Sequence, residues 1–328
     1  MKQLMSLPLC SESFAAYRSW DDLRAELARL GCGGLEGVWG GEDFLPDLPA
    51  DLIVGYHLTF YPDWLDFYRD DRAALVRKFG SLDTARRFYG GLGPETLLEQ
   101  YRRDLDRAAA LGAEYVVFHV SDVSLEEGYT YRWLHSNAEV IGAAVEVINS
   151  LLAGRDWPFA FLVENQWWPG FTFTQPEETA RLLDGIRCPD KGIMLDTGHL
   201  MNTNTALRTQ EEGAAYILEV LDRHGSLAGA VRGVHLHQSL SGAYVQAHTG
   251  MLPTGLPEDY LARFGESYGH ILYIDQHRPW TSPAILSVLE RLSVRWLTHE
   301  ISSRRRGARA RAVAEQTNLL RRGGLSDA

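Results

Sequence analysis

Residues 192–199 read GIMLDTGH, an apolar run that stops at an aspartate and is followed by a histidine. The same form, a short apolar or β-branched run ending in polar residues, recurs along the chain and is typical of a buried strand. It predicts eight strands, over residues 4–10, 33–40, 52–60, 115–122, 159–166, 192–199, 231–238 and 294–302. Amphipathic stretches between these runs predict helices over residues 20–31, 95–113, 136–153, 176–187, 211–223 and 283–292. This alternation of strand and helix indicates a parallel sheet with helical crossovers.

An open doubly wound sheet and a closed barrel both satisfy this alternation. The open sheet would carry a glycine-rich phosphate loop after the first strand, where this chain has LCSESF at residues 9–14. We therefore predict an α/β fold, a single (β/α)8 TIM barrel over residues 1–328. Two insertions are expected, after strand three (61–92) and after strand seven (239–282), with a C-terminal helix over residues 306–322.

Composition narrows the class of protein. The net charge of −11 disfavours a nucleic-acid surface, which needs clustered Lys and Arg, so a small-molecule partner is expected. Three scattered cysteines, Cys10, Cys32 and Cys188, suit a reducing compartment, and no apolar run is long enough for a bilayer, so we expect a cytoplasmic protein that needs no membrane. The oligomeric state stays open, with a homo-oligomer as one option.

Polar residues of a narrow kind follow the apolar runs. The residues at these positions are His57, His119, Glu164, Asp196, His235 and Glu300. In a barrel the carboxyl ends of the strands meet at one mouth, so three carboxylates would converge there. Such carboxylates repel one another and are costly to bury unless a cation compensates them. With an imidazole added, the donor set suits Zn²⁺, Mn²⁺ or Co²⁺ better than Ca²⁺.

The motifs LDTGH, VEN at Glu164, VHLHQ at His235 and THE at Glu300 resemble the xylose isomerase-like TIM-barrel superfamily over residues 4–301. The sugar epimerases of that superfamily hold one metal with a quartet that falls here on Glu164, Asp196, His235 and Glu300. The resemblance implies that the two glutamates also move protons and that His199 contacts the substrate. In its endonuclease IV members, histidines that fall on His57, His119 and His199 join the quartet, and three zinc ions are bound.

The superfamily's zinc-binding members also carry an Asp-x-His motif after strand seven, and here the chain departs from them. By spacing the motif falls on Gln246 and His248, and Gln246 is not an anionic ligand. A true Asp-x-His occurs at Asp275 and His277, some 40 residues beyond His235. His248 is kept as a candidate ligand. One to three divalent ions, zinc or manganese, are expected, with two favoured.

Three functions remain open from the sequence. The first is phosphoester hydrolysis of a small molecule by paired ions. The second is isomerisation or epimerisation of a keto-sugar on one ion, with Glu164 and Glu300 as the catalytic acid/base pair. The third is a barrel that keeps its metal only as a structural clamp. The expected substrate contacts are His199, His237, His277, Trp167, Trp168 and Arg278.

Overall fold

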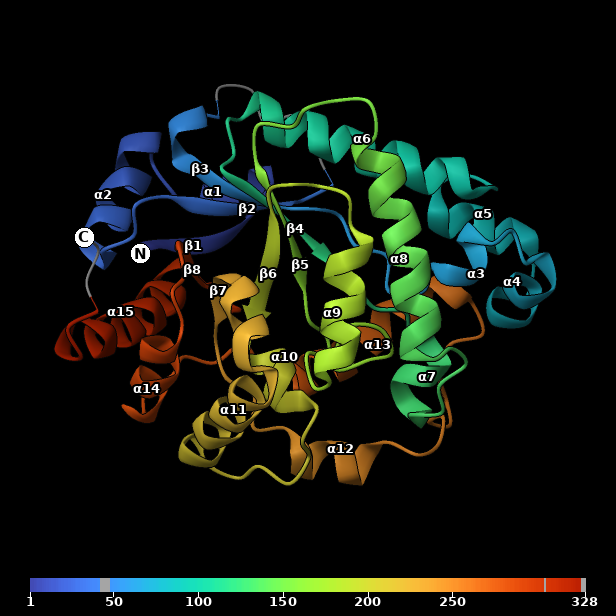
Figure 1. The fold of residues 1–328 in the computed structure, drawn as a ribbon. Coiled ribbons are helices and arrows are strands. Elements are labelled where there is room, and N and C mark those ends of the chain that lie inside the picture. Colours follow the sequence, from blue (N-terminus) through green and yellow to red (C-terminus); the bar gives the residue numbers. More distant parts are fainter. Residues whose placement is uncertain (42–47, 304, 326–328) are drawn as a thin grey trace.

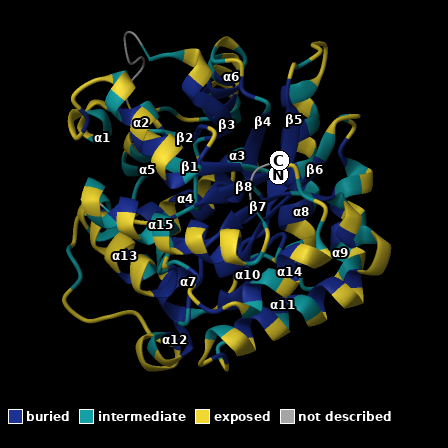
Figure 2. Cartoon of the chain, turned by 90° about the vertical axis from the view of Figure 1, so that its left-hand side faces the viewer, coloured by how far each residue is buried: buried dark blue, intermediate teal, exposed yellow. Residues whose placement is uncertain are grey.

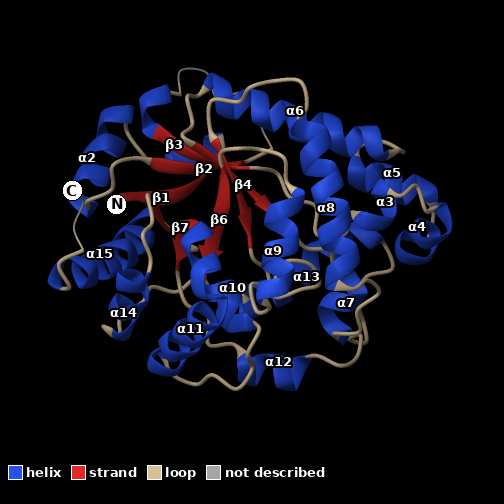
Figure 3. Cartoon of the chain, viewed as in Figure 1, coloured by secondary structure: helices blue, strands red, loops and turns tan. Residues whose placement is uncertain are grey.

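Eight parallel strands form a closed barrel in sequence order, with β8 paired to β1 (Figures 1 and 3). The computed structural model describes residues 1–41, 48–303 and 305–325. The strands are β1 (Lys2–Leu9), β2 (Leu35–Trp39), β3 (Ile53–His57), β4 (Tyr115–His119), β5 (Ala160–Glu164), β6 (Lys191–Asp196), β7 (Val231–Leu236) and β8 (Trp296–His299). The predicted TIM barrel is confirmed.

Several strands are shorter at their carboxyl ends than the sequence predicts. The strand expected over residues 192–199 ends at Asp196, and α10 (Thr197–Asn202) begins at the next residue. The Asp196 carboxylate causes this switch, since its Oδ1 accepts a hydrogen bond from the His199 backbone N–H at 2.6 Å and caps the helix. The strands expected to reach residues 60 and 166 likewise end at His57 and Glu164.

The strand register brings the polar ends together. His119 of β4 pairs with Glu164 of β5, and Asp196 of β6 pairs with His235 of β7. Because paired residues on parallel strands lie side by side, these four side chains start from neighbouring points on one rim of the barrel. The register therefore assembles a candidate site before any loop contributes.

Helices surround the barrel and bury one face each against it (Figure 2). The helices that cover the strands are α2 (Trp20–Leu30), α6 (Pro94–Ala110), α8 (Asn137–Leu152), α9 (Pro176–Gly185), α11 (Gln210–His224), α14 (Ala284–Arg291) and α15 (Arg306–Arg322). In α8 the buried residues include Val140, Ala144, Val147 and Leu151, which recur every three or four positions as an inward face requires. The short helix α1 (Ser11–Ala15) follows β1.

The segment over residues 61–92 folds into α3 (Leu65–Tyr68), α4 (Arg72–Phe79) and α5 (Leu82–Tyr89). Lys78 joins two parts of this segment through ion pairs, since its Nζ lies 2.6 Å from Asp63 Oδ1 and 2.8 Å from Asp66 Oδ2. We call this part of the chain the lid segment. The short helix α7 (Leu125–Thr130) follows β4.

The segment over residues 239–282 carries α12 (Gly242–His248) and α13 (Tyr260–Ile274) and lies at the end of the barrel toward which the strands point (Figure 1). We call it the covering segment. Val245 and Ile274 pack with Trp167 and Trp168, which follow β5, in one buried cluster. Among the described residues, no helix is both long and apolar enough to cross a bilayer.

Candidate metal centre

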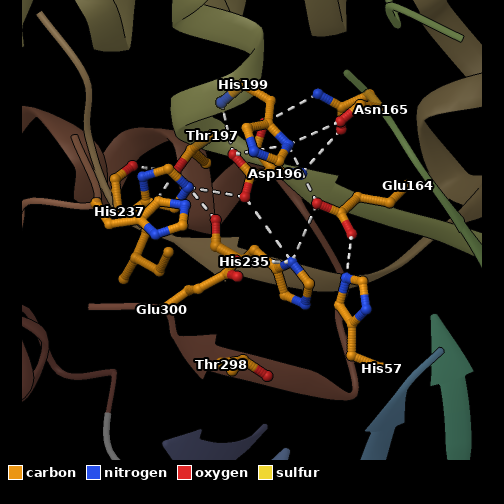
Figure 4. A network of polar contacts seen from close by, with 12 residues as sticks. His57, Glu164, Asn165, Asp196, Thr197, His199, His235, His237, Thr298 and Glu300 are labelled. Atoms are coloured by element: carbon orange, nitrogen blue, oxygen red, sulfur yellow. Dashed lines mark hydrogen bonds and ion pairs between the residues drawn. The ribbon is translucent and has the colours of Figure 1, made fainter. Parts of the chain in front are cut away.

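Three groups of histidines and carboxylates converge at the carboxyl end of the barrel, and in each the candidate ligand atoms lie within 4.8 Å of one another. Figure 4 shows Glu164, Asp196 and His235 pointing toward one another, with His57 on one side and His199 and His237 on the other. The first cluster is His57, His119 and Glu164; the second is Glu164, Asp196, His235 and Glu300; the third is His199, His237, Asp275 and His277.

The first cluster joins the ends of β3, β4 and β5. Glu164 Oε2 lies 3.2 Å from His57 Nε2 and 3.1 Å from His119 Nε2, and the two imidazole nitrogens are 3.0 Å apart. His57 Nδ1 donates to the Leu58 carbonyl at 2.9 Å, so the lone pair of His57 is on the nitrogen that faces the cluster. This is how a metal-binding histidine is oriented in proteins.

The second cluster joins β5, β6, β7 and the residue after β8. His235 Nδ1 lies 3.0 Å from Glu300 Oε2, 3.4 Å from Glu164 Oε1 and 3.8 Å from Asp196 Oδ2. Glu164 therefore serves two clusters, with one carboxylate oxygen in each. The three acids expected to converge do so around a single imidazole.

Glu36 of β2 lies beneath the second cluster and was not singled out from the sequence. Its carboxylate is fully buried and lies 2.9 Å from His235 Nε2, while Tyr115 OH and Thr298 Oγ1 donate to it at 2.6 and 3.1 Å. This contact places the His235 proton on Nε2 and leaves Nδ1 for an ion. The sequence signal that could have identified Glu36 is its charge in the middle of a predicted strand, since a buried charge requires a partner.

The third cluster brings the covering segment to the barrel. Asp275 Oδ2 lies 3.2 Å from His199 Nε2 and 2.7 Å from His277 Nε2. His199 Nδ1 contacts the Asn165 carbonyl at 3.0 Å, which leaves Nε2 facing Asp275. Burial acts to lower the pKa of His277, but the charge of Asp275 raises it to about 9.

The electrostatics of the second cluster reflect a concentration of negative charge. Burial acts to lower the pKa of His235, yet the charges of Glu36 and Glu300 raise it well above its ordinary value. Burial acts to raise the pKa of Glu164, and the neighbouring imidazoles of His119 and His235 hold it well below its usual range. The carboxylates thus stay ionised by drawing protons onto the histidines, and a bound cation would release those protons.

The residues present fit divalent ions. Each cluster mixes imidazole nitrogens with carboxylate oxygens, the donors that zinc and manganese share. Five buried ligand atoms make no hydrogen bond of good geometry within the described part of the chain: Glu164 Oε1, His235 Nδ1, His237 Nδ1, His277 Nε2 and Glu300 Oε2. All but His237 Nδ1 lie within 3.1 Å of an oppositely charged group, so these contacts are ion pairs crowded around two points, as donor atoms around an ion are.

His248, a candidate ligand by spacing, belongs to none of the three clusters. It ends α12, is exposed, stacks on the Tyr244 ring at 4.1 Å and contacts the Tyr244 carbonyl through Nδ1. Gln246 on the same helix is exposed as well. Asp275 and His277 lie in the third cluster instead, because α13 ends beside the barrel and brings the residues that follow it to the strand ends.

The expected substrate contacts divide into two groups. His199, His237 and His277 lie in the third cluster. The Trp167 ring lies 5.1 Å from the His199 ring and 4.2 Å from the Trp168 ring, and both indoles are almost fully buried. These two rings therefore pack beside the site, between it and the covering segment. Arg278, in contrast, is exposed and pairs through its backbone with Gln238.

Comparison with known proteins bears on the family. Among solved structures, the chain is similar to endonuclease IV from Thermus thermophilus (18% identity, TM-score 0.49, covering 98% of this chain and 100% of that one). It is also similar to a D-tagatose 3-epimerase-like protein (16%, 0.48, 99% and 98%) and to a sugar phosphate isomerase/epimerase from Parabacteroides distasonis (12%, 0.50, 99% and 96%). At 12% identity and a TM-score of 0.50, the last of these likenesses speaks for the fold alone.

No curated protein matches this sequence significantly. The model of one protein family, described as xylose isomerase-like TIM barrel, matches residues 25–322. That match spans most of the barrel, from α2 to the end of α15, and includes every residue of the three clusters. The chain therefore belongs to the xylose isomerase-like TIM barrel family.

Proposed function

We propose that this protein is a divalent-metal-dependent hydrolase that cleaves a small phosphoester, using ions held by the first and second clusters. The observation that carries the proposal is the position of Glu164. Its Oε2 lies within 3.2 Å of two imidazoles of the first cluster, and its Oε1 lies 3.4 Å from His235 Nδ1 in the second. A carboxylate shared in this way suits two neighbouring ions.

Divalent ions in both clusters would lower the pKa of a bound water molecule toward about 7 and offset the charge on a departing phosphate oxygen. The protein's own residues would hold the ions and orient the groups around them. The side chains of Glu164, Asp196 and His235 are at most 1% exposed and fix the donor positions. Glu300 is 17% exposed, so its outer face can accept a proton from the attacking water.

The substrate would approach from the side of β3, β4 and β8. His119 is 14% exposed in its side chain, and the ring of Phe60, itself 41% exposed, lies 4.7 Å from the His119 ring. Phe60 thus offers an apolar platform beside the first cluster. The opposite side is closed by Trp167 and Trp168 beneath the covering segment, which suits a small molecule.

Isomerisation of a keto-sugar on a single ion is the alternative. It needs Glu164 and Glu300 as an acid and a base that both reach the substrate. Glu164 is fully buried, and both of its oxygens face histidines, so it is poorly placed to face a substrate. A single-metal isomerase also does not need His57 and His119, whose Nε2 atoms in this chain lie within 3.2 Å of Glu164 Oε2.

A metal count combined with activity assays tests the proposal. The full-length chain, prepared with zinc, is expected to hold at least two ions, to hydrolyse nitrophenyl phosphate mono- or diesters, and to leave keto-sugars unchanged. His57→Ala and His119→Ala should each remove one ion and most of the hydrolysis. His248→Ala, which removes an exposed histidine outside the clusters, is the matched control and should change neither.

The isomerase makes the opposite prediction. One ion per chain that is indifferent to both substitutions, together with epimerisation of a keto-sugar, would overturn the hydrolase assignment. Two ions without turnover of any phosphoester would also refute it, since the metal would then be no more than a structural clamp.

A further inference from the structure

A second pocket lies beside the three clusters, among α7, α9, α10 and α11 (Figure 1). It has a volume of about 660 Å³, and none of its lining residues belongs to a metal cluster. We propose that this pocket binds a carbohydrate, through one neutral sugar ring, at a site separate from the metal centre. The inference goes beyond the hydrolase assignment and does not rest on it.

Trp168 and Asn202 each present a buried hydrogen-bond donor at this pocket. The two residues are 7% and 6% exposed, and Trp168 Nε1 and Asn202 Nδ2 have no hydrogen-bond partner among the described residues. The hydroxyl of Ser241 donates to Asn202 Oδ1 at 2.9 Å, which fixes the amide and leaves its NH₂ group for another acceptor. Buried donors are rarely left without an acceptor, so these two indicate a ligand that presents oxygen atoms.

Tyr216 adds a hydrogen-bond acceptor to the pocket. Thr203 Oγ1 donates to the Leu200 carbonyl at 2.7 Å, so in its 2.7 Å contact with the Tyr216 hydroxyl it is Tyr216 that donates. Because a hydroxyl has a single proton, the oxygen of Tyr216 keeps lone pairs for a donor from the ligand. A pocket that offers both donors and an acceptor suits hydroxyl groups, which can serve in both ways.

The charges at the pocket favour a neutral ligand. In the described part of the chain no carboxylate lines the pocket, and the basic residues that line it are Arg223 and His135. Arg223 Nε lies 4.0 Å from Glu219 Oε1, and His135 Nε2 lies 3.2 Å from Asp66 Oδ1, so each of them already faces an acid. A phosphate or carboxylate would find no unpaired cation among these lining residues, which argues against an anionic ligand.

Trp133 supplies the apolar face on which a sugar ring can pack. It lines the pocket, is 40% exposed, and its ring lies 5.0 Å from the Tyr131 ring, which packs against it. Binding sites for small molecules combine aromatic surface with a few polar groups that fix the orientation of the ligand. The C–H groups of a pyranose would pack on the indole, and the hydroxyl groups at its edge would reach the donors and the acceptor.

Two walls of the pocket are joined by the chain itself. One wall follows β4 and the other follows β5, and between them the Gly170 N–H donates to Asn137 Oδ1 at 3.0 Å. Gly170 has a φ of 133°, and a Cβ at this position would lie 2.2 Å from the Val120 carbonyl oxygen, so only glycine allows the approach. A preformed pocket loses less conformational freedom on binding, which favours a small ligand such as a single sugar ring.

Saturation-transfer NMR and calorimetry on the full-length, zinc-loaded chain test the proposal, with the methyl glycosides of glucose, galactose, mannose and xylose as probes. At least one glycoside should bind at millimolar concentration. Trp168→Phe keeps an aromatic ring and removes the N–H, so the Kd of that glycoside should rise about three- to tenfold. Trp133→Ala removes the platform and should raise the Kd at least about tenfold, and Trp133→Tyr should restore most of the affinity.

Leu134→Ala is the matched control, since Leu134 is 60% exposed, follows Trp133 and does not line this pocket. His57→Ala, which alters the first cluster, should bind the glycoside as tightly as the unaltered protein does. Three results would overturn the inference: no glycoside binds, Trp133→Ala binds as before, or binding is lost in His57→Ala because the sugar occupies the metal centre. Absent phosphoester turnover would refute the proposed hydrolase alone.

Discussion

Glu36→Gln is expected to weaken ion binding in the second cluster although Glu36 is not itself a ligand. Three donors converge on the Glu36 carboxylate, from His235, Tyr115 and Thr298. A glutamine keeps the volume and, at the Oε2 position, one acceptor oxygen for Tyr115, Thr298 and His235. Its amide NH₂ then takes the place of Oε1, 2.9 Å from His235 Nε2, donor against donor, and the negative charge that favours the proton on Nε2 over Nδ1, the atom that faces the ion, is lost.

The expected magnitude follows from this role. Loss of a carboxylate that orients a histidine ligand weakens metal affinity about 10- to 100-fold, or about 1.4–2.7 kcal/mol. The measurement is a zinc titration in competition with a chromophoric chelator, with thermal unfolding to show that the barrel still folds. Thr298→Val is the matched control, because it removes a donor to Glu36 and leaves the bond to His235 in place.

Two outcomes would refute this account of Glu36. One is an affinity of Glu36→Gln within about twofold of the unaltered protein, which would mean that His235 holds its tautomer without help. The other is an equal loss of affinity in Thr298→Val. The effect would then come from general disturbance of the barrel interior and not from the proton on His235.

Three further predictions concern the lid segment, the third cluster and the metal ions. Lys78→Met should destabilise the protein by about 3–5 kcal/mol in urea unfolding, because it leaves the buried Asp63 carboxylate without a cation and Asp66 with His135 alone, whereas the exposed Arg77→Met should cost less than about 0.5 kcal/mol. Equal effects would disprove the role of the ion pairs. Gly198→Ala should displace the His237 imidazole and lower the zinc count by one, and a full count would show that the ring has room to shift. Chelation should lower the melting temperature, since an ion present at 100 times its Kd adds about 2.7 kcal/mol, or about 4 °C for 328 residues. A scanning calorimetry trace that is unchanged by chelator would rule out ions that bind the folded state.

The course of the strands could be predicted because it depends on local patterns. Runs such as GIML at residues 192–195 are apolar throughout, as strands buried on both faces must be, and the helices between them carry a 3.6-residue period. The strand ends could not be predicted as well. After Asp196 the residues still suit a strand, but the carboxylate caps α10, and that depends on which hydrogen-bond partners the fold presents.

The candidate site was predictable to the extent that its members end strands. Glu164, Asp196, His235 and Glu300 stand in order after four apolar runs, and the barrel brings such positions to one rim. Glu36 escaped this reasoning because its partners Tyr115 and His235 are 79 and 199 residues away. Spacing also pointed to His248, whereas the fold places Asp275 and His277 beside the barrel.

By itself, then, the order of apolar runs and the polar residues that follow them determined a barrel with a candidate metal site at its mouth, because strand formation and the cost of crowding carboxylates are local or additive effects. Only the tertiary structure decided how those ligands divide into three clusters and that Glu164 serves two of them. It also decided that the covering segment supplies the third cluster's last two donors. The reason is that a ligand set depends on distances of a few Å between atoms. The number of residues between two ligands does not determine such distances when α12 and α13 lie between them.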